Sequence, residues 1–176
     1  IQKNYPKFYY VSSTTKVITD FDGFKNETDR EKFRYVVPDF RFNKRFDRLS
    51  TLSEEQKKKT EFLCNECCNF GCSDRKKCYE SVSRKSLGET GIEHYCTSPD
   101  AEEGYIFSKA MLNPGFIGID DIRNIYIPMG YMNFKIEGRG LGSALILEFL
   151  LYYMTKPEYR INVREEIYLD NMLDLF

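Results

Sequence analysis

Cysteine crowding is the strongest chemical signal in this sequence. Of the six cysteines, five fall within fifteen residues, and the sixth follows soon after; they are Cys64, Cys67, Cys68, Cys72, Cys78 and Cys96. Thiolates bind soft or borderline metals, and four of them complete a tetrahedral or cluster-binding set. Gly71 lies inside the core spacing Cys68-x₃-Cys72-x₅-Cys78, where a small loop can turn its thiols toward one point. Cys96, further along the chain, is the candidate fourth ligand.

The spacing leaves three interpretations open. It lacks the paired C-x₂-C knuckles that are typical of zinc fingers and ribbons. It also lacks the C-x₂-C-x₂-C run of bacterial ferredoxins. We favour a 4Fe-4S cluster and keep structural zinc, or cysteines that are merely buried without a shared role, as the alternatives. For Cys64, which lies in an apolar strand, we expect a buried small hydrophobe.

A second candidate site follows the segment Asn133-Phe-Lys-Ile-Glu-Gly-Arg139. Alternation along a strand places Lys135 and Glu137 on the face opposite Phe134, and Arg139 follows a glycine that permits a tight exit. Sites in α/β proteins are built at the carboxyl ends of strands. These charged residues are therefore candidates for binding a substrate, and a purely structural ion pair is the alternative.

Short β-type runs alternate with helical patterns, which favours parallel βαβ units. Strands are expected at residues 7–11, 33–37, 61–64 and 131–136. Helices are expected after the caps at 12–14 and 53–55, and at 46–52, 78–86, 120–126, 141–154 and 163–175, with a loop at 39–43. A closed (β/α)₈ barrel needs eight strands, so four strands indicate either a small open sheet or half a barrel. A first residue of Ile rather than Met favours part of a longer protein.

Composition excludes several classes of protein. Lys plus Arg total 26 and Asp plus Glu total 27, which excludes a generally basic nucleic-acid coat and a strongly acidic tail. Hydrophobic residues make up 41% of the chain, enough for a core. The longest apolar run, residues 144–154, is broken by Glu148 and is too short to span a membrane. We expect a cytoplasmic, reducing environment, in which cysteines bind metals rather than form disulfides.

Together the Lys-Ile-Glu-Gly-Arg strand at 135–139 and the segment Asn65-Glu-Cys-Cys-Asn-Phe-Gly-Cys72 resemble the collagenase-like U-thirty-two peptidase family. The resemblance runs over about residues 9–159. It implies an iron–sulfur TIM-type (β/α) barrel, of which this chain is the C-terminal half or another part: a single partial barrel domain at 1–176 with a cysteine cluster inserted at 64–96. Position by position, it implies the cluster ligands Cys68, Cys72, Cys78 and Cys96. Members are named as peptidases, while others carry out oxygen-independent hydroxylation of RNA bases or quinone precursors.

Weaker candidates surround these two sites. His94, the one histidine, is either an exposed loop residue or a donor or alternative ligand beside Cys96; no nucleophile motif accompanies it, which disfavours a triad hydrolase. Glu66, Asp39 and Asn43 follow strands and would lie at the same end of a barrel. The basic run at 75–77 favours a solvated helix face, with a phosphate or thiolate contact as the alternative.

Two functional hypotheses follow. The first is an iron–sulfur redox or hydroxylase-type enzyme, peptidase by family name, in which Glu137 and Arg139 bind substrate and Lys135 pairs with one of them. Its substrate could be RNA, a peptide or a small aromatic acid. The second is a non-catalytic module, stapled by zinc or a cluster, that completes a barrel or docks a partner. In either case the remainder of the barrel would come from a longer chain or a second protein, because an unpaired sheet edge needs covering.

Overall fold

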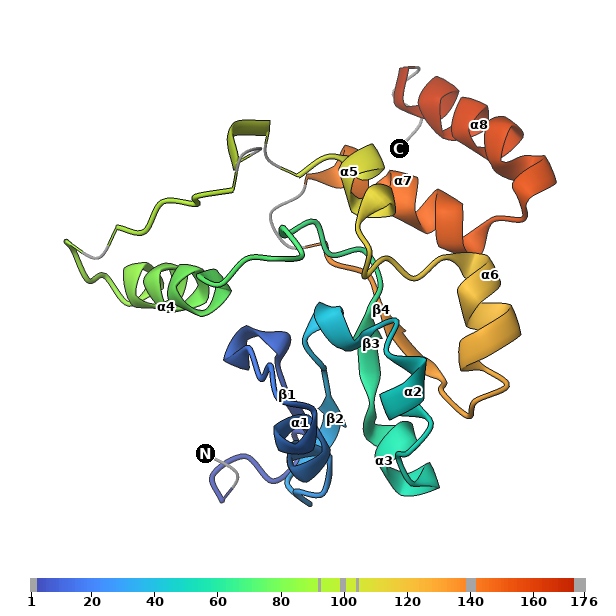
Figure 1. Cartoon of the computed structure of the whole chain (residues 1–176). Coiled ribbons are helices and arrows are strands. Elements are labelled where there is room, and N and C mark those ends of the chain that lie inside the picture. The colour runs from blue at the N-terminus through green and yellow to red at the C-terminus, as the bar shows by residue number, and fades with distance from the viewer. Residues whose placement is uncertain (1–2, 92, 99–100, 104, 139–141, 173–176) are drawn as a thin grey trace. The chain divides into compact units, whose positions relative to one another are not determined.

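The computed structural model of the 176-residue chain forms two compact units, Ile1–Lys135 and Ile136–Phe176, and each is described by itself (Figure 1). The structure describes residues 3–91, 93–98, 101–103, 105–138 and 142–172.

Parallel strands form the centre of the first unit. In the described part of this unit they are β1 (Tyr10–Ser12), β2 (Phe33–Val36), β3 (Glu61–Leu63) and β4 (Asn133–Lys135). β1 pairs in parallel with β2, and β3 pairs in parallel with β4. One parallel bridge between Val36 and Thr60 connects these two small sheets, so neighbouring strands follow chain order. The predicted α/β class, strand positions and parallel pairing are confirmed, with β1 displaced toward the C-terminus.

Short helices connect the strands of this unit (Figure 1). The α-helices are α1 (Phe21–Thr28), α2 (Phe46–Leu49), α3 (Glu54–Lys59), α4 (Arg75–Ser86), α5 (Phe107–Leu112) and α6 (Ile119–Asp121). Tighter or wider turns are η1 (Thr14–Lys16), η2 (Phe40–Phe42), η3 (Ala101–Glu103) and η4 (Ile122–Tyr126), the last of which is a π-helix.

Helix starts agree with the capping residues. The expected cap at Ser53 is confirmed as a full capping box, in which the Ser53 side chain accepts from the Gln56 N–H and the Gln56 side chain accepts from the Ser53 N–H. Asp20 caps α1 by accepting from the Gly23 N–H at 2.7 Å. Such caps satisfy N–H groups that have no partner inside the helix.

Some expected elements differ. Residues 39–43, expected as a loop, contain η2, because the Asp39 carboxylate accepts from the Arg41 N–H and starts a turn. The helix expected at 46–52 ends at Leu49. Neither α1 nor α5 was expected: the α1 segment is largely polar and contains Gly23, which weakens a helical pattern.

An aromatic core fixes β3 and β4 to the elements that precede them. The ring centroid of Phe62 lies 4.9 Å from that of Tyr126, 5.0 Å from Tyr131 and 6.2 Å from Phe134. The buried Tyr131 hydroxyl donates to the Leu49 carbonyl at 2.8 Å, and the Tyr126 hydroxyl donates to a backbone carbonyl as well. Both phenols therefore bury their rings without leaving a hydroxyl unsatisfied.

The second unit is a pair of helices joined by a short turn. It comprises α7 (Ser143–Met154), η5 (Pro157–Tyr159) and α8 (Arg160–Met172). Arg160 donates to the Tyr152 carbonyl at 2.9 Å, which satisfies the C-terminal end of α7, and Arg164 pairs with Glu148. The two expected C-terminal helices are confirmed over the described residues. No helix in those residues is long and apolar enough to cross a membrane.

Candidate metal centre

The cysteine-rich segment begins where β3 ends. Cys64 continues β3 through a hydrogen bond from its N–H to the Lys135 carbonyl at 2.9 Å, and it is buried. Burial raises the pKa of the Cys64 thiol to about 12, so this thiol is inert at neutral pH. The expectation that Cys64 is a buried small hydrophobe is confirmed.

A buried network of charges holds the loop that follows. The Arg75 guanidinium, at the start of α4, pairs with the Glu66 carboxylate, and its Nε lies 3.8 Å from Asp39. The side chains of all three residues are at most 7% exposed. Arg41 holds the same Asp39 carboxylate from the other side at 2.6 Å and 2.9 Å. Two acids and two guanidiniums therefore compensate one another beneath the loop.

The carboxylate of Glu66 also fixes the backbone of the loop. Its Oε1 accepts hydrogen bonds from the Cys67 N–H at 3.0 Å and the Cys68 N–H at 2.9 Å. Further along, the Asn69 side chain accepts from the Gly71 N–H at 2.8 Å, and the Asn69 carbonyl accepts from the Cys72 N–H at 3.1 Å. The chain between the first and second candidate ligands is thus a hydrogen-bonded turn.

Side chains from two other segments donate hydrogen bonds to backbone carbonyl groups of the loop. Asn113 donates to the Cys68 carbonyl at 2.8 Å, and Arg41 donates to the Cys72 carbonyl at 3.1 Å. The Phe70 ring packs edge-on against Phe40, with centroids 5.6 Å apart. A hollow of about 470 Å³, whose lining includes Cys67, Cys68, Phe70 and Asn113, adjoins this part of the loop.

Burial and neighbouring charges raise the pKa of two of the four thiols that are expected as ligands. Burial raises the pKa of Cys68 to about 11; the Arg75 guanidinium opposes this shift, and the charge of Cys72 adds to it. Burial also raises the pKa of Cys78, as do the neighbouring charges of Cys72 and Cys96. Cys67 is buried, whereas Cys68, Cys72 and Cys78 are half-buried and Cys96 is exposed. Among the described residues, no three metal-binding side chains are already grouped tightly enough to hold an ion.

His94 lies near Asp74, the residue that precedes α4. Its charge interacts with Asp74, which lies between Cys72 and Cys78 in the chain. Nε2 of His94 is buried and has no hydrogen-bond partner in the part of the chain that the structure describes. The side chain is half-buried, so the expectation of an exposed loop histidine is not met.

Residues of the second candidate site are only partly placed. Lys135 ends β4 and faces Leu63 across the β3–β4 ladder, so it lies at the same end of the strands as the cysteine loop. Glu137 belongs to the second unit, and Arg139 lies outside the described residues. Phe134 packs into the aromatic core, as the alternation of the strand predicts.

Several neighbouring residues have roles other than those expected. Arg75 is 2% exposed, so the expectation of a solvated basic face is wrong for Arg75, although Lys76 and Lys77 are exposed. Asn43 is buried, and its side chain donates to the Leu63 carbonyl at 2.9 Å and to the Gly115 carbonyl at 2.7 Å. Its role is therefore structural, because it connects the end of β3 to the segment around Gly115. No sequence signal marked Arg75, because the helix was expected at 78–86, whereas α4 begins at Arg75 itself.

Comparison with known proteins gives no relative. The sequence matches no protein-family model and no curated protein, and the structure matches no solved structure.

Proposed function

We propose that this chain binds a 4Fe-4S cluster through Cys68, Cys72, Cys78 and Cys96. The observation that carries the proposal is where these cysteines lie: Cys68 and Cys72 lie in the hydrogen-bonded turn that follows β3, Cys78 lies at the start of α4, which the Arg75–Glu66 pair ties to that turn, and Cys96 follows α4. The four cysteines therefore come from a turn, a helix and a later loop. Metal sites in proteins are often built in this way, from ligands that lie in different elements.

The surroundings of Cys68 fit a negatively charged group. Cys68 is half-buried beside Arg75, whereas its neighbour Cys67 is buried, which favours Cys68 as the ligand. Arg75 supplies positive charge to a set of four thiolates, and hydrogen bonds to cluster sulfurs tune such sites. The buried, unpartnered Nε2 of His94 offers one more donor in the same neighbourhood.

The four thiolates would hold the cluster, and a bound cluster would supply one-electron redox chemistry. The chain's own residues contribute positioning. Glu66 fixes the loop backbone through two N–H groups, Arg75 ties that carboxylate to the helix that carries Cys78, and Asn113 holds the loop from the opposite side. This arrangement presents the ligands on a stiff base.

For the fold, we propose a partial TIM-type barrel, the C-terminal half of one resembling the U-thirty-two peptidase family. Four parallel strands that neighbour one another in chain order support it, because barrel strands are adjacent in sequence order whereas doubly wound sheets reverse it. Lys135, Glu137 and Arg139 would then bind substrate, as the resemblance to that family implies. The remainder of the barrel would cover the free edges of the sheet.

Within this proposal the chain is part of a cytoplasmic redox or hydroxylase-type enzyme rather than a triad hydrolase. An organic substrate with a carboxylate or phosphate would suit a site containing Lys135 and Arg139. RNA, a peptide and a small aromatic acid all meet that description.

Anaerobic reconstitution with iron and sulfide tests the proposal. We expect a brown protein with about four irons per chain and broad visible absorption. Serine variants at Cys68, Cys72, Cys78 and Cys96 should each lower the bound iron, with the fold checked by far-ultraviolet circular dichroism.

Cys64→Ser and Cys67→Ser are the matched controls, because they change cysteines of the same segment that are not proposed as ligands. Both should retain iron. A colourless wild-type protein that holds zinc would instead support a metal-stapled structural module. Equal loss of iron in the controls and in the four ligand variants would refute the assignment of ligands.

A further inference from the structure

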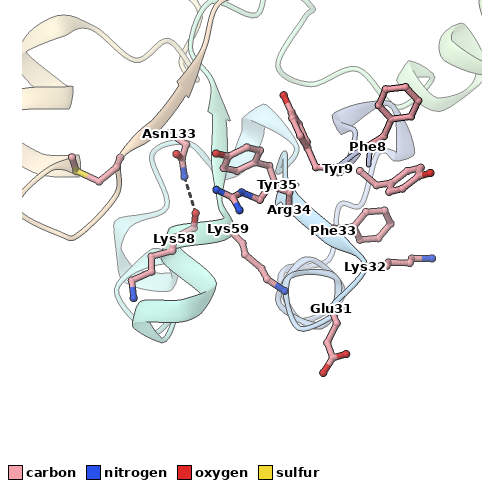
Figure 2. A pocket seen from close by; sticks show the side chains of 12 residues that line it. Phe8, Tyr9, Glu31, Lys32, Phe33, Arg34, Tyr35, Lys58, Lys59 and Asn133 are labelled. Atoms are coloured by element: carbon pink, nitrogen blue, oxygen red, sulfur yellow. Dashed lines mark hydrogen bonds between the residues drawn. The ribbon is translucent and has the colours of Figure 1, made fainter. Parts of the chain in front are cut away.

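The opposite end of the strands carries a surface of a different kind. A hollow of about 640 Å³ opens where the strands begin, and its lining includes Phe8, Tyr9, Lys32, Arg34, Tyr35 and Lys59 (Figure 2). We call it the basal hollow. It includes the first residues of β1, β2 and β4, whereas the cysteine loop follows the last residue of β3. Its volume lies in the range of roughly 300–1,000 Å³ that is typical of ligand sites.

Positive charge is concentrated in the basal hollow. Its described lining contains the cationic side chains of Lys32, Arg34, Lys58 and Lys59 and one carboxylate, that of Glu31, although the chain as a whole has a formal charge of −1. Of these cations, Lys58 is paired with Glu55, which lies outside the lining. The Lys59 ammonium bonds to the carbonyl groups of Thr28 and Arg30 at 3.0 Å and 3.2 Å, which fixes it without cancelling its charge. The guanidinium of Arg34 lies 5.8 Å from the centroid of the Tyr35 ring. An anion would therefore meet preorganised positive charge.

Aromatic rings stand beside these charges. Phe8 and Tyr9 are 67% and 70% exposed, far more than large aromatic side chains usually are. Tyr9 meets Tyr35 edge-on, with centroids 6.1 Å apart and ring planes 88° from parallel. Tyr9 therefore keeps exposed ring surface on which a flat group can stack, whereas Phe8 already stacks against Tyr5, with ring centroids 5.9 Å apart and ring planes 29° apart. Figure 2 shows these rings on β2 and on the segment that enters β1, with Arg34 and Lys59 on the same side.

We propose that the basal hollow binds a single-stranded nucleic acid. Cations that follow a phosphate backbone, combined with rings on which unpaired bases stack, form the usual surface for this ligand. A base-paired duplex keeps its bases stacked on one another, and a purely anionic surface offers nothing for Phe8 and Tyr9 to contact. The inference does not depend on the metal site, because none of its residues belongs to the cysteine loop.

Fluorescence anisotropy with a labelled oligouridylate of about 12 nucleotides tests the proposal on the full chain; known modules cover roughly 4–16 nucleotides. We expect saturable binding that weakens with salt, and weaker binding of a duplex of equal charge. The double variant Phe8→Ala/Tyr9→Ala should bind about 5- to 100-fold more weakly, the range that alanine substitution gives per stacked base. Arg34→Gln should reduce the slope of log Kd against log salt by about 0.7.

Lys156→Gln/Tyr159→Ala is the matched control, because it removes one exposed cation and one exposed ring from the second unit. It should leave the affinity unchanged. Absence of oligouridylate binding would overturn the proposal, and so would equal binding to inorganic polyphosphate, which has no bases. Binding to vesicles of anionic phospholipid without binding to the oligonucleotide would show that the surface meets membranes instead. If the aromatic variant does not fold, an unchanged salt slope for Arg34→Gln would still refute the proposed site.

Discussion

Arg75 and Glu66 should be strongly coupled in the stability of the first unit. Changing Arg75 to Met removes the counter-charge of a carboxylate whose side chain is 7% exposed. Removal of one partner of a buried ion pair costs about 3–5 kcal/mol. Asp39 keeps Arg41 at 2.6 Å, and Glu66 keeps two backbone donors, so we expect the lower end, about 3 kcal/mol.

Glu66→Gln should cost less, about 1–2 kcal/mol, because the amide oxygen can still accept from the loop N–H groups. The double variant Arg75→Met/Glu66→Gln leaves neither charge behind. It should therefore be more stable than the sum of the single effects predicts by about 2 kcal/mol, a large part of the 5–15 kcal/mol that is typical of a domain.

Urea unfolding, monitored by circular dichroism, gives the free energy of unfolding of the wild type, the two single variants and the double variant, which together form a double-mutant cycle. Lys58→Met is the control, because it breaks an ion pair with Glu55 whose two side chains are 67% and 82% exposed. The urea midpoint of the control should barely move. Additivity of the Arg75 and Glu66 effects to within about 0.5 kcal/mol would refute the claim that they form one buried unit.

Two further predictions concern buried polar groups. Burial would raise the pKa of Glu27, but hydrogen bonds from Lys16, Ser12 and Arg30 outweigh it and lower that pKa to about 2 from an ordinary value of 4.5. The stability this carboxylate contributes is therefore complete above about pH 4.5 and is lost as the pH falls toward 2. Glu27→Gln should remove at most about 3 kcal/mol of acid-dependent stability in urea titrations at pH 2–7, and a variant with the unchanged pH profile would contradict the assignment. Asn43→Ala should lower the free energy of unfolding by about 2–4 kcal/mol, because two buried carbonyls lose their donor; a loss below about 0.5 kcal/mol would show that water replaces it.

Local patterns were enough to predict much of the fold. A run of aromatic and β-branched residues marks β2, the apolar Phe62-Leu63 pair marks β3, and the cap at Ser53 marks α3. Each of these signals lies within a few residues of the element it specifies. The helices α1 and α5 were missed for the opposite reason. α1 begins at one side-chain cap, Asp20, and α5 has no side-chain cap, so neither helix carries a strong sequence pattern of its own.

In the candidate site, too, features set by residues close in sequence could be predicted, and features set by distant residues could not. Spacing alone indicated which cysteines could share a centre, because those ligands are close in sequence. The role of Arg75 could not be predicted in this way. Its partner Asp39 lies far back in the chain. Its neighbours Lys76 and Lys77 are exposed, so the basic run as a whole indicated a solvated face, whereas Arg75 is buried.

The strand order has a consequence for the path of folding. Tyr10 and Phe33 pair across a short connection, whereas Thr60 and Asn133, which meet at the start of the β3–β4 ladder, are 73 residues apart. Closing the longer loop costs about 1 kcal/mol more in chain entropy, since this cost grows as (3/2)RT ln n. We therefore expect β1 and β2 to form early and β4 to dock last. The cysteine segment lies within the long connection between β3 and β4. If its thiols bind a metal before β4 docks, that connection becomes effectively shorter, which lowers the entropy cost of pairing β4 with β3.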